Sequence, residues 1–180
     1  MPLFRVLFLV NLALLGTVLQ GCAQKNVPMD KPTCVNPEFD KTIAGMLNFS
    51  TPLIGVDALK KIQDEVIIFD ARKREEFEVS HLKGARYIGY DDFDETRIAD
   101  VPKDAKIVVY CSIGYRSEKI GNKLQQLGYR KVYNLYGSLF EWVNRGFEVY
   151  DTSGKTVKKV HGYNEKWSKW VDNPAYEKVW

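Results

Sequence analysis

The sequence predicts an α/β fold in which a parallel sheet is covered by helices on both faces. Continuous apolar runs at residues 66–69 and 107–110 are typical of strands that are buried on both sides. Segments with the apolar spacing of helices lie between such runs, and this alternation indicates a parallel sheet. The length of 180 residues and the composition, 45% hydrophobic and 27% charged, suit a single globular domain.

Residues 1–21 have the layout of a secretory signal and are predicted not to belong to the fold. Arg5 is their only charge, and the apolar run at residues 6–15 is short for a membrane span. The following LQGC resembles a bacterial lipobox, although Gln20 is unusual at its position. We therefore expect cleavage before Cys22, lipidation of its thiol, and a membrane-anchored protein in an extracytoplasmic space, the periplasm or cell envelope. Ordinary secretion and an uncleaved anchor are the alternatives.

Residues 22–50 are assigned to the lipidated cysteine and a tether. Residues 23–36 are polar and contain two prolines, which is typical of a linker. Cys34 is interpreted as an incidental linker cysteine, although the spacing leaves a disulfide with Cys111 open. Residues 37–49 are expected to include a short helix, because four apolar side chains fall on one side: Phe39, Ile43, Met46 and Leu47.

The domain itself is assigned to residues 51–147, where strands and helices alternate. Asp57 is expected to cap a helix that continues to Ile62. The elements outside the central stretch are expected, in chain order, as a strand at 66–69, a helix at 73–79, a short strand ending at 88, a helix at 91–98, a strand at 131–135 and a helix at 137–145. In a parallel sheet of this kind, ligands bind at the carboxyl ends of the strands.

The stretch between Lys106 and Gly128 combines a strand, a turn and a helix. The apolar, β-branched strand comes first and is followed by the polar turn CSIGYR. Ile120 and Leu124 then begin the apolar face of a helix, and Gly128 lies where a helix C-cap is expected. Cys111 is therefore expected directly after a strand end and just before a helix N-terminus.

This placement has chemical consequences for Cys111. A helix N-terminus presents unpaired N–H groups and a partial positive charge, which bind anions and lower the pKa of a nearby thiol. Arg116 adds a permanent cation with a forked set of donors, and Gly114 permits a tight backbone turn. We interpret the turn as a nucleophile aimed at an anionic substrate.

Four segments in this order resemble the rhodanese (sulfurtransferase) domain family: IIFDARKREEF, HLKGARYIG, IVVYCSIGYRS and GYRKVYNLYGSLFEW. The resemblance covers about residues 54–147. It implies a single rhodanese-like domain with a five-stranded parallel sheet and helices on both faces. It also implies that Cys111 forms a persulfide and that Arg116 helps to bind the anionic donor. The backbone N–H groups that would hold the sulfur belong to Ser112, Ile113, Gly114, Tyr115 and Ser117.

The length of this loop separates activities within the family's fold. Four residues lie between Cys111 and Arg116, as in the sulfurtransferases, whereas the related phosphatases have one residue more. The resemblance therefore implies an enzyme of the thiosulfate sulfurtransferase type, which moves sulfane sulfur from an anionic donor such as thiosulfate to a thiophilic acceptor. Two alternatives stay open. One is a sulfur carrier or protein-binding module with little turnover, and the other is a phosphatase or arsenate reductase of the same fold.

Other polar residues are given structural interpretations. Arg72 either faces the pocket or forms an ion pair, and a structural pair with Asp70 or Glu76 is favoured. With two histidines and no clustered ligands, we expect no metal site, and we expect no cofactor. A net charge of +3 is too small to indicate nucleic acid. The expected partners are a small sulfur-containing anion, a thiol acceptor and the lipid anchor, while any protein partner stays open.

The aromatic C-terminal extension, residues 148–180, is the segment with the least specific pattern. Residues 147–160 alternate around Ser153-Gly154 and predict a hairpin. Trp167, Trp170 and Val171 lie at helical spacing. We expect the aromatic side chains to pack back on the domain, because each has a large apolar area to cover. The alternative is a docking surface for a partner or for the membrane interface.

Overall fold

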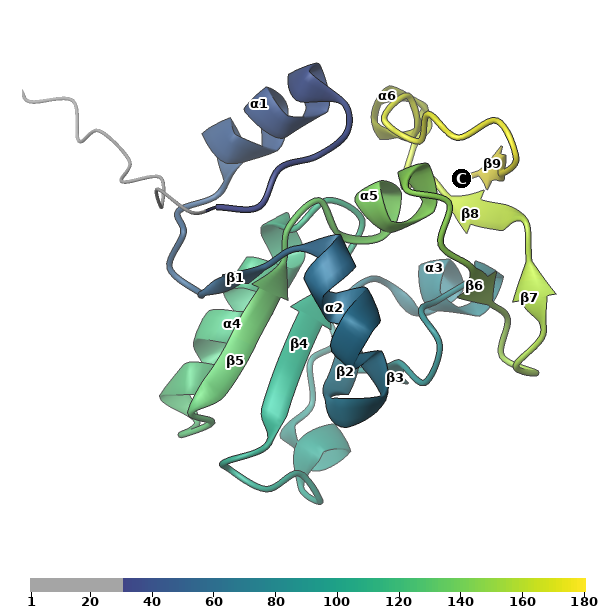
Figure 1. The fold of residues 1–180 in the computed structure, drawn as a ribbon. Helices are drawn as coiled ribbons and strands as arrows, with labels where there is room; N and C mark the ends of the chain where they lie inside the picture. Colours follow the sequence, from purple (N-terminus) through teal and green to yellow (C-terminus); the bar gives the residue numbers. More distant parts are fainter. Residues whose placement is uncertain (1–30) are drawn as a thin grey trace, which may run out of the picture.

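A computed structural model describes residues 31–180, and a five-stranded sheet with only parallel pairings lies at its centre (Figure 1). The strand order is β1-β5-β4-β2-β3. The strands are β1 (Leu53–Ile54), β2 (Ile67–Asp70), β3 (Arg86–Tyr87), β4 (Lys106–Tyr110) and β5 (Lys131–Leu135). The predicted α/β fold is confirmed.

The two faces of this sheet are buried under different helices. Successive side chains of a strand point to opposite faces. Val108 and Tyr110 of β4 accordingly join one core, which includes residues of α1 (Pro37–Met46), α2 (Val56–Ile62) and α5 (Ser138–Asn144). Ile107 and Val109 join a second core with α4 (Tyr115–Gln126). A four-residue apolar run is needed at β4 because neither face is open to water.

The N-terminal part of the described chain, residues 31–50, is packed against the domain. The expected helix is present as α1, and the Asn36 side chain caps it by accepting from the N–H groups of Glu38 and Phe39. Its apolar side buries Phe39 and Ile43 in the first core. The interpretation of Cys34 as an incidental linker cysteine was wrong, because the residue is only 8% exposed and belongs to that core. The expected signal, Cys22 and residues 23–30 lie outside the described residues.

Two helix starts differ from expectation. Gly55, rather than Asp57, is the N-cap of α2, and Asp57 lies in the first turn instead. Residues 91–98 contain only a 3₁₀ turn, η2 (Glu95–Ile98), because the Asp94 side chain accepts from the Thr96 N–H and fixes the start there. A second 3₁₀ turn, η1 (Gln63–Glu65), follows α2, and α3 (Arg74–Val79) follows β2.

The C-terminal extension packs on the domain, as expected. The hairpin pairs β6 (Val149–Tyr150) with β7 (Thr156–Val157). β8 (Lys159–His161) pairs in parallel with β9 (Glu177–Val179), and α6 (Glu165–Ser168) lies between them in the sequence. Figure 1 shows α1, α6, β8 and β9 beyond the arrowheads of β4 and β5, where the strands end, and the β6–β7 hairpin at the side near α3. Within residues 31–180, no helix has both the length and the apolar character that a membrane crossing needs.

Candidate active site

Cys111 lies in a tight loop between the end of β4 and the start of α4. The Gly114 N–H donates to its Sγ at 3.2 Å, and the Ser117 Oγ lies 3.6 Å from the same sulfur. Gly114 is the N-cap of α4 with φ +114°, a left-handed conformation that side chains with a Cβ resist. The turn therefore curls its N–H groups around the sulfur.

The neighbouring α5 holds the loop in place. The Cys111 N–H donates to Ser138 Oγ at 3.1 Å, and that hydroxyl donates to the Leu135 carbonyl at 2.9 Å. The carbonyls of Cys111 and Ser112 accept from the first N–H groups of α5, those of Leu139 and Phe140. Groups that a helix start leaves unpaired thus bond to the loop backbone.

A buried amide supports the other side of the loop. The Asn134 Nδ2 donates to the Gly114 carbonyl at 3.0 Å, and its Oδ1 accepts from Ser117 Oγ at 2.7 Å. Asn134 is fully buried in β5. The Asn134 side chain therefore positions both the backbone of the turn and the Ser117 hydroxyl. The sequence shows this residue only as a polar side chain inside an apolar strand, and Asn134 was not among the predicted site residues.

Arg116 is held by a carboxylate. Its guanidinium donates to both oxygens of Glu76, at 2.6 and 2.9 Å, and to Ser112 Oγ at 2.9 Å. Burial raises the pKa of Glu76, but the bonds to Arg116 and its charge outweigh burial and lower that pKa to about 2. Glu76 therefore pairs with Arg116 and not, as the sequence suggested, with Arg72. The cation is fixed at the edge of the loop.

The charges around the sulfur favour its ionised form. Burial of Cys111 raises the pKa of the thiol, and three residues oppose this: Arg116 through its cation, Ser117 through its N–H and hydroxyl, and Gly114 through its N–H. Together they lower the pKa of Cys111 below its ordinary value. The site supplies a thiolate at neutral pH more readily than a free cysteine would.

Arg72 lies below the site and does not face it. It is fully buried, and its guanidinium donates to both Asp70 oxygens at 2.6 to 3.0 Å and to the Ser80 carbonyl at 2.6 Å. Asp70 also accepts from the Tyr110 hydroxyl at 2.6 Å. The structural ion pair is confirmed, and the pocket-facing alternative is wrong, because Arg72 is absent from the cavity wall.

A cavity of about 290 Å³ opens above Cys111. Ser112, Ile113, Tyr115 and Arg116 of the loop line it, whereas Gly114 and Ser117 lie beneath the sulfur. The remaining wall comes from distant segments that the sequence did not connect to the site: Met46, Lys73, Tyr90, Asp91, Tyr163 and Trp167. Among residues 31–180, no group of three or more histidine, cysteine or acidic side chains is arranged to hold a metal ion.

Comparisons with known proteins agree with this geometry. The family model described as "Rhodanese-like domain" matches residues 56–145. A tRNA uridine(34) hydroxylase of Erwinia tasmaniensis is 36% identical over 89 residues, which are 47% of this chain and 25% of that protein. The one from Escherichia fergusonii is 31% identical over 118 residues, 63% of this chain and 33% of that protein. The chain thus spans a quarter to a third of these relatives.

Solved structures share the fold. A rhodanese-like domain from Anabaena sp. has a TM-score of 0.52 at 23% identity, covering 56% of this chain and 79% of that one. A thiosulfate sulfurtransferase from Pseudomonas aeruginosa has a TM-score of 0.52 at 20% identity, covering 67% of this chain and 23% of that one. The family match covers half of the sequence, and a cysteine loop lies at the end of β4, so this chain belongs to the rhodanese-like domain family.

Proposed function

We propose that this chain is a sulfurtransferase in which Cys111 carries the transferred sulfur as a persulfide. The observation that carries the proposal is the placement of Sγ, 3.2 Å from the Gly114 N–H and under the influence of the Arg116 cation. Such a cradle stabilises negative charge on sulfur, much as an oxyanion hole stabilises negative oxygen.

The reaction has two half-reactions. The Cys111 thiolate attacks the outer sulfur of a donor such as thiosulfate, an Sγ–S bond forms, and sulfite leaves with the electron pair of the broken S–S bond. A thiophile then attacks the outer sulfur of the persulfide, and Cys111 leaves as a thiolate. No proton has to be supplied to either leaving group, which agrees with a Glu76 that is ionised and fully paired. Covalent catalysis in two steps predicts ping-pong kinetics.

The contacts of Arg116 favour sulfur transfer over phosphoryl transfer. An arginine that clamps a phosphoryl group directs its forked donors at the phosphate oxygens. Here three of the five N–H groups of Arg116 donate to Glu76 and Ser112, so a forked approach to a phosphate would have to break the bonds to Glu76. The hydroxylase activity in the relatives' names belongs to proteins three to four times the matched length, of which this chain resembles only a part.

Mass spectrometry tests the proposal directly. After incubation with thiosulfate, the intact protein is expected to gain one sulfur atom, and the Cys111→Ser variant is expected to gain none. Cys34→Ser is the matched control and should still gain the sulfur. Cyanide-dependent formation of thiocyanate then separates an enzyme from a carrier. A protein that gains no sulfur, or that keeps turnover in Cys111→Ser, is not a sulfurtransferase of this kind.

The proposal includes a location, which rests on the sequence pattern before Cys22. A lipid on Cys22 would hold the domain at a membrane in the periplasm or cell envelope. The mature protein should then carry the mass of a lipid on an N-terminal Cys22 and fractionate with membranes. Cys22→Ala should abolish the lipid and the membrane association, and a wild-type protein without lipid would contradict this part of the proposal.

A further inference from the structure

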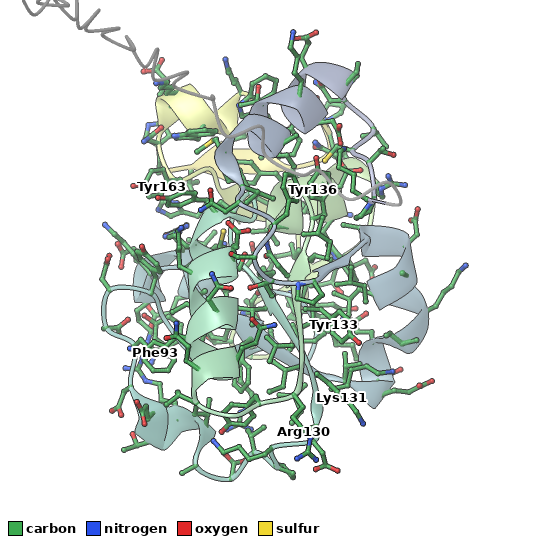
Figure 2. All side chains as sticks on the ribbon, turned by 90° about the vertical axis from the view of Figure 1, so that its left-hand side faces the viewer. Phe93, Arg130, Lys131, Tyr133, Tyr136 and Tyr163 are labelled. Atoms are coloured by element: carbon green, nitrogen blue, oxygen red, sulfur yellow. The ribbon has the colours of Figure 1, made fainter. Side chains whose placement is uncertain are left out.

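The C-terminal cap, residues 159–180, supplies two aromatic side chains to the cavity above Cys111. Tyr163 and Trp167 line this cavity together with Met46 at the end of α1. Figure 2 shows Tyr163 where the C-terminal segment meets the nearer end of α4. The segments that precede and follow the rhodanese-like domain in the sequence therefore both help to enclose the Cys111 loop.

The cap is fastened to the domain at several points. The Asn144 side chain donates to the Trp170 carbonyl at 2.8 Å and accepts from the Asp172 N–H at 2.8 Å. The Trp170 ring stacks on Phe39 with centroids 5.5 Å apart, and the Tyr176 hydroxyl donates to the Phe147 carbonyl at 2.8 Å. Tyr163 and Trp167 are thus held at a fixed position relative to the loop.

Tyr163 is placed for contact with a ligand more than for packing. It is 43% exposed, although most large apolar side chains of the cap are covered. Its backbone has φ +68°, a conformation that is unfavourable for a residue other than glycine and that often marks functional sites. Its ring centroid lies 5.1 Å from the Arg116 guanidinium carbon, so one face of the ring meets the loop cation.

The cavity combines an apolar wall with cations. Tyr163, Trp167 and Met46 supply apolar surface. Of the charged residues that line the cavity, Lys73 and Arg116 are cations and Asp91 is a carboxylate, so positive charge is in excess. Its volume of about 290 Å³ is near the lower end of the range, roughly 300 to 1,000 Å³, in which proteins bind small organic molecules. Thiosulfate is a small ion without an apolar part, and it would leave this wall unused.

We infer that the C-terminal cap forms a subsite for an apolar group on the sulfur donor, and that Tyr163 and Trp167 determine this specificity. The inference rests on the proposed sulfur transfer. The substrate class is a sulfane-sulfur anion with an organic substituent, such as a thiosulfonate, R–SO₂–S⁻. The thiolate of Cys111 attacks the outer sulfur, the S–S bond breaks, and the sulfinate R–SO₂⁻ leaves with the electron pair while R contacts the aromatic wall.

The test compares two donors, benzenethiosulfonate and thiosulfate, in the full chain. Their intrinsic reactivities differ, so the measured quantity is the ratio of their kcat/KM values in each variant. Tyr163→Ala is expected to lower the ratio of benzenethiosulfonate to thiosulfate about three- to tenfold, the usual effect of one aromatic contact. Tyr163→Asn should do the same, because asparagine accepts the left-handed backbone better than alanine.

Two further variants serve as controls. Tyr163→Phe retains the ring and should retain the wild-type ratio. Trp180→Ala removes an aromatic side chain of the cap that is 61% exposed and lies outside the cavity wall, and it should leave the ratio unchanged. Competitive inhibition against benzenethiosulfonate by benzenesulfonate, which cannot accept sulfur, gives a second readout, and its inhibition constant should rise by the same factor in Tyr163→Ala and Tyr163→Asn only.

The outcomes separate the two proposals. Equal ratios in wild type, Tyr163→Ala and Tyr163→Asn, with sulfur still loaded on Cys111, would overturn the subsite and leave sulfur transfer standing. Failure of both donors to load Cys111 would overturn sulfur transfer, and the subsite with it. A ratio that falls equally in Trp180→Ala would also count against the subsite, since it would trace the effect to the cap as a whole.

Discussion

The two free cysteines in the described part of the chain are both buried, yet their thiols differ in chemistry. Burial raises the pKa of each. Around Cys34 the carboxylates of Glu141 and Asp40 add to burial, and the pKa lies far above its ordinary value. Around Cys111 the Arg116 cation and the loop donors oppose burial, and the pKa is lowered. The charges around each sulfur, more than the degree of its burial, decide which thiol can act as a nucleophile.

The carboxylates of Asp40 and Glu141 near Cys34 stabilise the N-terminal segment. Asp40 accepts from the Cys34 N–H at 3.0 Å, and Glu141 accepts from the Val35 N–H at 3.0 Å. The same groups that fasten the N-terminal segment to the domain thus suppress the thiol beside them. At Cys111 the backbone donors face the sulfur, because the turn before α4 curls around it.

Exchange of each cysteine for serine should show the largest difference between the two thiols. Cys111→Ser is expected to reduce thiosulfate-dependent thiocyanate formation to the uncatalysed background, because the persulfide cannot form. Cys34→Ser should leave kcat/KM within about twofold, at a loss of stability on the order of 1 kcal/mol for the altered core contact. Steady-state kinetics with both substrates varied checks this, and substantial activity in Cys111→Ser would contradict it.

Alkylation should sharpen the difference between the two thiols. Iodoacetamide is expected to label Cys111 through the cavity, with a rate midpoint below that of an ordinary thiol, because the pKa of Cys111 is lowered. Cys34 should react only after denaturant unfolds the chain. Peptide mapping assigns the label to each cysteine, and Arg116→Gln should raise the midpoint at Cys111. Equal labelling of both cysteines in the folded protein would show that their environments do not differ in this way.

The sequence predicted the site's local parts better than its distant contacts. β5 has the predicted bounds, and β4 begins one residue before its apolar run, because each lies between turns. β1 was not predicted, since two residues carry no period and the strand exists through its pairing with β5. The nucleophile and its loop follow from a local strand–turn–helix pattern, which a sequence displays directly.

The contacts that complete the site come from tertiary packing. Glu76 and Arg116 are 40 positions apart, and nothing in their neighbourhoods selects this pair over one with Arg72. Tyr163 and Trp167 reach the cavity only because the extension folds back over the carboxyl ends of the strands. The sequence shows that the extension is rich in aromatic residues, but it does not show which part of the domain they contact.

Removal of the Glu76 charge should destabilise the fold, because it breaks the buried ion pair with Arg116. The pKa of Glu76 is lowered from 4.5 to about 2 in the folded protein. Its stabilisation is therefore complete above pH 4.5 and is lost as the pH falls toward 2, and it amounts to roughly 3 kcal/mol. Glu76→Gln should reduce the free energy of unfolding by about this amount at pH 7, measured by urea denaturation, and the deficit should shrink at pH 3.

Glu75→Gln is the matched control for this change. Glu75 is 63% exposed at its side chain and lies 3.8 Å from Lys73, so its loss should change stability by less than about 0.5 kcal/mol at either pH. A deficit in Glu76→Gln that stays constant between pH 7 and pH 3 would show that the carboxylate charge is not its source. Glu76→Gln should also lower kcat/KM, because Arg116 loses the partner that fixes it beside the sulfur.

The smallest effect is expected at Ser117. Its hydroxyl hydrogen is shared between Asn134 Oδ1 at 2.7 Å and the Cys111 Sγ at 3.6 Å, so the hydroxyl stabilises the thiolate less than the Gly114 N–H does at 3.2 Å. Ser117→Ala should lower kcat/KM about three- to tenfold and raise the pKa of Cys111 measured by alkylation. Ser80→Ala, which removes another buried hydroxyl outside the loop, should change neither quantity. An unchanged thiol pKa in Ser117→Ala would assign the lowering to Arg116 and the backbone N–H groups alone, and the difference between the two cysteines would then depend on fewer groups.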